Sequence, residues 1–176
     1  MEAIGKLYLE SALFRFRGTK ELGDKALAQL TAGDLAWTPG PESNSIVVIV
    51  QHLHGNMLSR WTDFLDSDGE KPSRDRDGEF VEPANADYGS VLDKWNEGWD
   101  CLFRAIEALT ADDLNKNITI RGQTMNALDA INRQVAHVSY HVGQIVYLAR
   151  MRTGSAWKTL SIARGASRAY TPARRD

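Results

Sequence analysis

Apolar residues recur at spacings of three and four in four long stretches of the chain. The stretches run from about Glu2 to Leu30, from Ser45 to about Asp66, from Leu92 to Leu109, and from about Asn126 to Thr153. This spacing gathers apolar side chains on one side of an α-helix, and each such stripe must be buried against a partner. The pattern predicts an all-α fold, a four-helix bundle that forms a single domain over residues 1–176.

The segments between the predicted helices add two features. SDGEKPSRDRDGEFVEPANAD, between the second and third helices, is long, charged and rich in Gly and Pro. A connection of this length predicts a crossover between helices that are not adjacent antiparallel neighbours. ITIRGQT, residues Ile118–Thr124, predicts a short hairpin with its turn at Arg121–Gly122, just before the fourth helix. Residues 158–176 are expected to form an extended tail over the surface.

A six-residue motif occurs twice, each time after a long predicted helix. It reads LTAGDL at Leu30–Leu35 and LTADDL at Leu109–Leu114. The repeat indicates either two helical hairpins of common ancestry or simply a favourable turn at the end of a helix. The sequence leaves both interpretations open.

Composition narrows the class of protein. The 176 residues carry a formal charge of −2, so no overall positive field attracts nucleic acid. Charges interrupt the opening MEAIGKLYLESALFRFRG, which therefore lacks the apolar region of a signal peptide. No apolar run approaches the ~20 residues of a membrane span. We expect a cytoplasmic protein without nucleic-acid or membrane partners, whose single cysteine, Cys101, is a buried thiol.

The four histidines are placed unevenly. His137 and His141 lie four residues apart on the fourth predicted helix, at the edge of its apolar stripe. Residues at this spacing share one helix face, so both rings can reach one metal ion. The same spacing occurs in the zinc-protease motif HExxH, but Val138 stands where that motif has its glutamate, which excludes such a protease. Two histidines that only form hydrogen bonds inside the bundle are the alternative.

His52 and His54, on the second predicted helix, cannot both face the fourth helix. They are two residues apart and point about 200° from one another around the helix axis. His52 lies at the edge of the apolar stripe, as His137 does, so burial favours His52 as the third ligand. We expect His54 to pack beside Trp61 or to face a partner subunit, and we retain it as the alternative ligand.

Three segments together resemble the DinB/YfiT-like superfamily of four-helix proteins, and within it a mostly uncharacterised bacterial subgroup. They read NSIVVIVQHLHGNMLSRWTDFL, GEKPSRDRDGEF and INRQVAHVSYHVGQIVYLAR. The resemblance implies a bundle with a long crossover, a homodimer, and a divalent metal held by one histidine of helix two and two of helix four. These ligands correspond to His52, His137 and His141. Zinc or nickel suits three imidazoles, as iron or manganese also can.

The resemblance also implies a class of reaction. Relatives include transferases that join low-molecular-weight thiols to electrophiles, a thiol-dependent isomerase, and hydrolases. We therefore expect a metal-dependent enzyme, either a thiol-dependent S-transferase or a related hydrolase or isomerase. Its expected substrates are a small thiol and an electrophilic small molecule. The sequence identifies no catalytic side chain. The alternative is a non-catalytic dimeric metal-binding or interaction protein, whose seam would be the helix face formed by Ala136, Tyr140, Gly143 and Tyr147.

Several polar residues lie near the predicted metal ligands. Arg133, one helical turn before His137, and Asn56, one turn after His52, are the candidate substrate-binding residues. Side chains that could accept hydrogen bonds from the histidine rings are Asn56, Gln134 and Gln144. Lys71, Arg74 and Arg76 either clamp a substrate carboxylate or belong to a solvated loop in which Asp75 and Asp77 neutralise the arginines.

Overall fold

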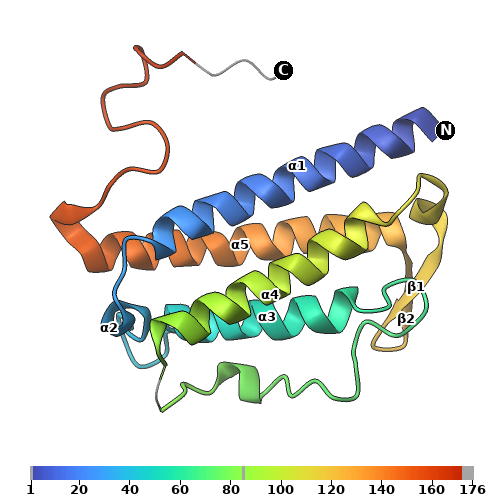
Figure 1. Ribbon diagram of the computed structural model, residues 1–176, viewed down its shortest axis with the longest axis horizontal. Helices are drawn as coiled ribbons and strands as arrows, with labels where there is room; N and C mark the ends of the chain where they lie inside the picture. Colours follow the sequence, from blue (N-terminus) through green and yellow to red (C-terminus); the bar gives the residue numbers. More distant parts are fainter. Residues whose placement is uncertain (1, 85, 172–176) are drawn as a thin grey trace.

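Four long helices make up most of the computed structural model, which describes residues 2–84 and 86–171 (Figure 1). They are α1 (Glu2–Leu27), α3 (Ile46–Trp61), α4 (Tyr88–Glu107) and α5 (Ala127–Thr153). Between them lie a short helix, α2 (Ala32–Leu35), and two short 3₁₀ helices, η1 (Gly78–Phe80) and η2 (Asp112–Asn115), and a third, η3 (Gly154–Ala156), follows α5. The prediction of a mainly helical protein is confirmed, and α2 and η1 are elements that the apolar pattern did not predict.

The long helices form two parallel pairs. Helices α1 and α5 pack together and run in the same direction, and α3 and α4 pack together and run in the opposite direction (Figure 1). Because α3 and α4 are parallel, the chain must return along their whole length between them. Residues 62–87 make that return and carry η1 on the way, which explains the length of this linker.

Aromatic side chains fill the core between the pairs. Phe16, Trp95 and Trp99 are among the largest fully buried side chains. Gly23 lets α1 approach α4 closely, since a Cβ atom there would lie 2.5 Å from Cζ2 of Trp95. Gly23 thus makes room for a neighbouring indole ring.

The helix ends have identifiable causes. Ser45 caps α3, because its hydroxyl accepts a hydrogen bond from the Val48 amide at 3.1 Å. Helix α5 ends at Thr153, before Gly154 with φ of 55°. Helix α3 stops at Trp61 rather than near Asp66, since Asp63 has φ of 48°, a left-handed conformation that a helix does not continue through.

The predicted hairpin is present and anchors the linker. Strand β1 (Asn117–Ile120) pairs antiparallel with β2 (Gln123–Asn126), and Arg121 and Gly122 form the turn with φ of 56° and 71°. The Asp68 carboxylate accepts hydrogen bonds from both turn amides at 2.9 Å. The linker and the hairpin are therefore held together at one end of the molecule.

Both copies of the LTAxDL motif form the same turn. The Asp34 carboxylate accepts hydrogen bonds from the Thr31 amide and hydroxyl at 2.9 and 2.7 Å, and Asp113 accepts from the Thr110 amide and hydroxyl at 2.8 and 2.7 Å. A short helical turn follows each, α2 and η2. The Thr31 and Arg152 hydrogen bonds lower the pKa of Asp34 to about 2. This turn explains the repeated motif locally, whether or not the two halves share an origin.

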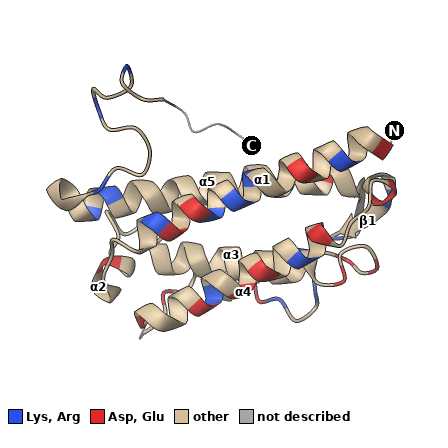
Figure 2. Ribbon diagram, turned by 45° about the horizontal axis from the view of Figure 1, so that its top comes forward, with Lys and Arg blue, Asp and Glu red and all other residues tan. Residues whose placement is uncertain are grey.

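The surface and the C-terminal segment complete the description. Acidic and basic residues are interspersed along α1 and α4 (Figure 2), so neither helix presents a stripe of one sign. Residues 158–171, the described part of the predicted tail at 158–176, contain no helix or strand. The Lys158 backbone is held by two hydrogen bonds with the Gln29 side chain. Residues 172–176 lie outside the described part. No helix of the described residues combines the length and hydropathy required to cross a membrane.

Candidate metal centre

Three of the four histidines meet between α3 and α5. The ring centroids of His52 and His141 are 4.9 Å apart, those of His137 and His141 are 4.7 Å apart, and those of His52 and His137 are 5.2 Å apart. Each ring offers one nitrogen to a common point, and these nitrogens lie within 4.8 Å of one another. His52 and His141 are buried, and His137 is half-buried. We call these three residues the histidine cluster.

The spacing within the histidine cluster fits a divalent metal ion. The Nε2 atoms of His52 and His137 are 3.2 Å apart. Two nitrogens bound to zinc at ~2.0–2.1 Å in tetrahedral geometry would be about 3.3 Å apart. Two ring nitrogens this close require a proton or a cation between them, because their lone pairs otherwise repel. The three residues could therefore hold a metal ion.

A buried carboxylate orients His52. Nδ1 of His52 lies 2.9 Å from Oε2 of Glu79, and a carboxylate can only accept, so Nδ1 carries the proton and Nε2 presents its lone pair to the cluster. Arg74 donates to the two carboxylate oxygens at 2.6 and 2.9 Å. Burial alone would raise the pKa of Glu79, but the hydrogen bonds from His52 and Arg74 outweigh it and lower that pKa. Glu79 is thus ionised.

Local backbone features place Glu79 against His52. Glu79 lies on η1, and the Gln51 side chain donates to the carbonyls of Gly78 and Glu79 at 3.1 Å each. A Cβ atom at position 55 would collide with the Glu79 carboxylate, so glycine there lets this carboxylate lie close to α3. The Phe80 ring covers His52, with ring centroids 4.8 Å apart.

The α5 histidines are held in their neutral form. Nδ1 of His141 pairs with Oε1 of Gln144 at 2.9 Å, which leaves Nε2 for the cluster. Burial, with the neighbouring His141, His52 and two arginines, lowers the pKa of His137 to about 3. Burial also lowers the pKa of His141 to about 4. Neutral imidazole is the form that binds a metal.

His54 lies apart from the histidine cluster. Its Nε2 atom pairs with Oε2 of Glu97 on α4, at 2.7 Å. This contact forms because α4, parallel to α3, covers the face that His54 occupies.

Arg74 departs from one of the two interpretations given for the linker arginines, that of a solvated loop neutralised by Asp75 and Asp77. Its side chain is instead buried, 4% exposed, and pairs with Glu79 and Glu70. Asp75 accepts a hydrogen bond from the Gly78 amide. Arg74 therefore acts on the candidate metal centre through Glu79.

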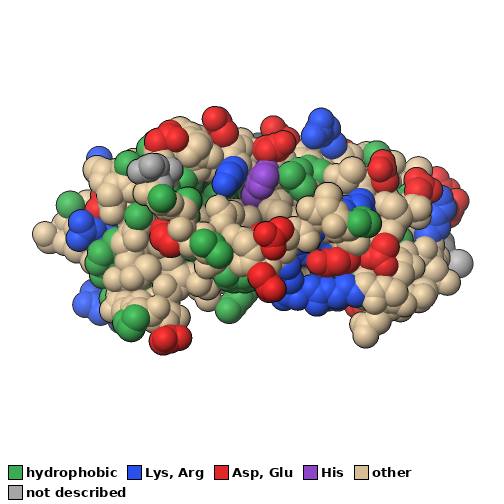
Figure 3. Space-filling model, turned by 90° about the horizontal axis from the view of Figure 1, so that it is seen from below, with side chains coloured by type: hydrophobic (Ala, Val, Ile, Leu, Met, Phe, Trp, Pro, Cys, Tyr) green, Lys and Arg blue, Asp and Glu red, His purple; other side chains and the backbone are tan. Residues whose placement is uncertain are grey.

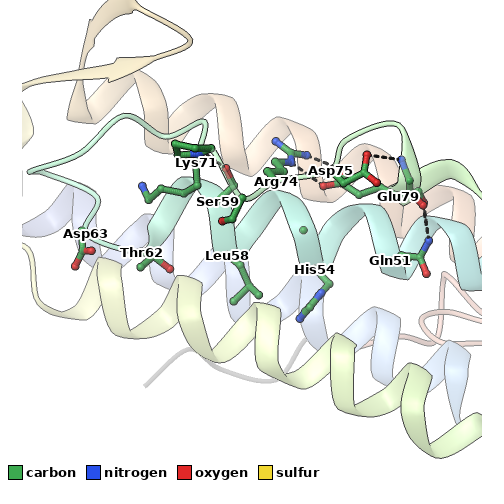
Figure 4. Close-up of a pocket in the computed structure, with 14 residues that line it drawn as sticks. Gln51, His54, Leu58, Ser59, Thr62, Asp63, Lys71, Arg74, Asp75 and Glu79 are labelled. Atoms are coloured by element: carbon green, nitrogen blue, oxygen red, sulfur yellow. Dashed lines mark hydrogen bonds and ion pairs between the residues drawn. The ribbon is translucent and has the colours of Figure 1, made fainter.

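Two cavities adjoin this region. The larger, of about 800 Å³, lies between α3 and the linker (Figure 4) and is bordered by His54, Ser59, Lys71 and Glu79. None of the three clustered histidines lines it. The smaller, of about 140 Å³, is lined by His52 and His137 together with the predicted substrate residues Asn56 and Arg133. We call the smaller cavity the arginine pocket, and it is the one in contact with the histidine cluster.

Sequence reasoning missed Glu79, Gly55 and Arg60. Glu79 is one acidic residue among many in the linker, 27 positions from His52, so no spacing rule could select it. Arg60 had a usable signal. With His52 and Asn56 it forms a polar series at positions i, i+4 and i+8 on one face of α3, and all three are buried.

Comparisons with known proteins place the chain in a family but assign no activity. Searches of curated proteins and of solved structures found no match. A family model described as a protein of unknown function, DUF1572, matches residues 3–166, which include the histidine cluster, Glu79 and the arginine pocket. Since the match covers nearly the whole chain, this protein belongs to the DUF1572 family.

Proposed function

We propose that the protein binds one divalent metal ion through His52, His137 and His141, and that it is a metal-dependent enzyme. The observation that carries the proposal is the histidine cluster itself. Its ring nitrogens converge within 4.8 Å, Glu79 and Gln144 fix the tautomers of His52 and His141, and burial keeps the α5 rings neutral. Isolated core histidines have no need of this arrangement.

The chemistry follows from the ligand set. Three neutral imidazoles leave a position open, and a metal bound in this way lowers the pKa of a bound water or thiol and so supplies a nucleophile near neutral pH. The proposed activity is that of a thiol-dependent S-transferase, or of a related hydrolase or isomerase, on the four-helix bundle of DinB/YfiT-like proteins. Its proposed substrates are a low-molecular-weight thiol and an electrophilic small molecule. Zinc or nickel is the proposed metal, because imidazole ligands suit both.

The second candidate is a dimeric metal-binding protein without turnover. Tyr140 and Tyr147 are 61% and 66% exposed on α5, and Leu7 of the adjacent α1 is 66% exposed. A second copy of the chain would cover this face and form the proposed homodimer. The Tyr140 ring also contacts His141, with centroids 4.5 Å apart, so the face adjoins the histidine cluster. Analytical ultracentrifugation of the wild type and of Tyr147→Lys tests the dimer.

Metal analysis tests the primary proposal. The metal-free protein is loaded separately with zinc and with nickel, desalted, and measured by mass spectrometry. We expect one ion per chain in the wild type, and loss of that ion in the single alanine variants of His52, His137 and His141. His54→Ala is the matched control and should keep the ion. Loss from His54→Ala with retention by His52→Ala would contradict the ligand assignment.

Activity distinguishes the two candidates. The loaded protein is incubated with a panel of small thiols and an aryl halide, and thioether formation is followed by absorbance. Turnover that disappears with a chelator and returns on adding metal supports the enzyme. A fully loaded dimer that turns over none of the substrates supports the non-catalytic candidate.

A further inference from the structure

The arginine pocket has an unusual charge. Five arginines line it, and no acidic residue of the described chain does: Arg60, Arg74, Arg76, Arg121 and Arg133. They come from α3, the linker, the hairpin turn and α5, which meet at this point. The face shown in Figure 3 has a cluster of basic side chains in the half of the molecule that carries the hairpin. The chain as a whole carries a charge of −2, so this concentration is local.

Nearby carboxylates balance only part of this charge. Glu70 pairs with Arg60, Arg74 and Arg121 at 2.8, 3.4 and 3.2 Å. Glu79 pairs with Arg74, and its second partner is His52. Within the described residues, Arg76 and Arg133 form no ion pair, and both are exposed, which puts them on the solvent side of the pocket. The local balance is five arginines against two carboxylates.

Residues that line the pocket also carry most of the buried polar atoms that lack a partner. Five such side-chain atoms occur among residues 2–84 and 86–171, and four belong to residues that line this pocket. Three are nitrogens that can donate, namely Trp61 Nε1, Gln134 Nε2 and His137 Nδ1, and the fourth is Asn56 Oδ1. Leaving such a group unsatisfied costs about 1–3 kcal/mol. A group that accepts several hydrogen bonds would remove this cost.

We propose that the arginine pocket binds the acidic group, a carboxylate or a phosphate, of a small-molecule substrate. The volume of about 140 Å³ equals that of four or five water molecules, enough for one such group. Guanidinium groups bind both kinds of oxyanion through paired hydrogen bonds. His52 and His137 belong to the histidine cluster and also line the pocket, so the anion would lie beside the proposed metal. The assignment to a substrate rests on the proposed function, whereas anion binding itself requires no metal.

Calorimetric titration tests the proposal on the metal-free protein, with inorganic phosphate and malonate as separate probes at low ionic strength. The test variant is Arg76→Gln/Arg133→Gln, which leaves every ion pair of Glu70 and Glu79 in place. The matched control is Arg150→Gln, an exposed arginine of the same helix that does not line the pocket. We expect the double variant to bind the preferred anion at least about tenfold more weakly, and the control to bind as the wild type does.

A second variant checks the buried donors. Trp61→Phe removes Nε1 and retains most of the ring. We expect anion binding to weaken several-fold, while the anion-free protein loses only the packing of the larger ring, because the lost N–H has no partner. The two probes show whether a carboxylate or a phosphate is preferred.

The outcomes separate this proposal from the metal site. Anion binding that depends on Arg76 and Arg133 supports it even if no metal is retained, in which case only the proposed function fails. Equal binding by the wild type and the double variant overturns it, as does equal weakening in Arg150→Gln. The anion proposal is also overturned if the wild-type protein binds metal but binds neither phosphate nor malonate. The proposed metal site is not affected by that result.

Discussion

Helix α3 contacts α4 along one side and α5 along another, and different kinds of residue form the two contacts. Toward α4 the contact is close and adjoins the apolar core, in which Leu53, Met57, Trp99 and Leu102 are all fully buried. Gly98 brings the helices together, since a Cβ atom there would lie 3.2 Å from Cα of His54 and 2.8 Å from Cε of Met57. Such contacts supply the favourable free energy of folding.

Toward α5 the contact is polar. His52, Asn56 and Arg60 are buried on α3, and Gln134 and His141 are buried on α5. Buried polar groups cost free energy unless they are satisfied, and Asn56 and Gln134 each have an atom with no partner. The α3–α4 contact therefore stabilises the fold, whereas the polar groups of the α3–α5 contact are those that the proposed metal and anion would satisfy.

The largest effect is expected from breaking the apolar contact. Trp99→Ala should destabilise the protein by about 3–5 kcal/mol, because it leaves a large cavity where the indole is fully buried. Urea denaturation measures this. Trp99→Phe is the control and should cost much less, since the lost Nε1 has no hydrogen-bond partner among the described residues. Similar costs for the two variants would mean that the N–H matters more than packing.

The polar contact should make stability sensitive to acid. Burial lowers the pKa of His137 to about 3 and of His141 to about 4, from 6.5 in an unfolded chain. Below pH 6.5 these two histidines therefore bind protons in the unfolded chain but stay neutral in the folded chain. This contribution to stability is complete above pH 6.5 and is lost as pH falls toward 4.

We expect the metal-free protein to melt about 5 °C lower at pH 5 than at pH 7, as followed by circular dichroism. His137→Asn/His141→Asn removes both groups and should flatten the profile between these pH values. An unchanged profile in this variant would place the acid sensitivity elsewhere.

Glu79 should control metal affinity without touching the metal. Glu79→Gln removes the charge that fixes the His52 ring and should weaken metal binding by about 10- to 100-fold, measured by competition with a chelating dye. The control is Glu82→Gln, a linker carboxylate that accepts hydrogen bonds from Ser45 rather than from a histidine. Equal weakening in both variants would indicate a general effect of linker charge.

Gly55→Ala tests the role of the Glu79 carboxylate without changing a charged residue. The added methyl group would displace Glu79, so metal affinity should fall although every charged group remains. Gly18→Ala is the control, because its Cβ would meet nothing within 4 Å. That substitution should instead stabilise the helix by about 1 kcal/mol.

The smallest effect is expected at His54. Its partner Glu97 has a side chain that is 62% exposed, and pairs of this kind contribute about 0.2–1 kcal/mol. His54→Ala should therefore change stability by less than about 1 kcal/mol, as urea denaturation would show. A loss above about 2 kcal/mol would show that the ring also supports the apolar contact with α4.

Several features were accessible from the sequence because they depend on local geometry. Helical spacing gave the four long helices, and Arg121–Gly122 gave the hairpin turn. The interval from His137 to His141 placed two rings on one face, and the edge position of His52 singled it out from His54. The proposed pairing of a histidine ring with Gln144 follows from a three-residue interval on α5.

Other features depended on where the linker runs, which no local rule fixes. Glu79 reaches His52 only because α3 and α4 are parallel and the linker must return along α3. The interpretation of Arg74 as an exposed side chain was wrong for the same reason, since its partner Glu79 is set against α3 by Gly55 and Gln51.

The sequence by itself determined the helical periodicity, the turn residues and the residue types that can ligate a metal, because these properties act over a few neighbouring positions. Only the tertiary structure decided which acid orients which histidine, which arginines remain without a carboxylate, and which buried donors lack a partner. These depend on distances between segments far apart in the chain, where burial and charge are set by all of the packed elements together.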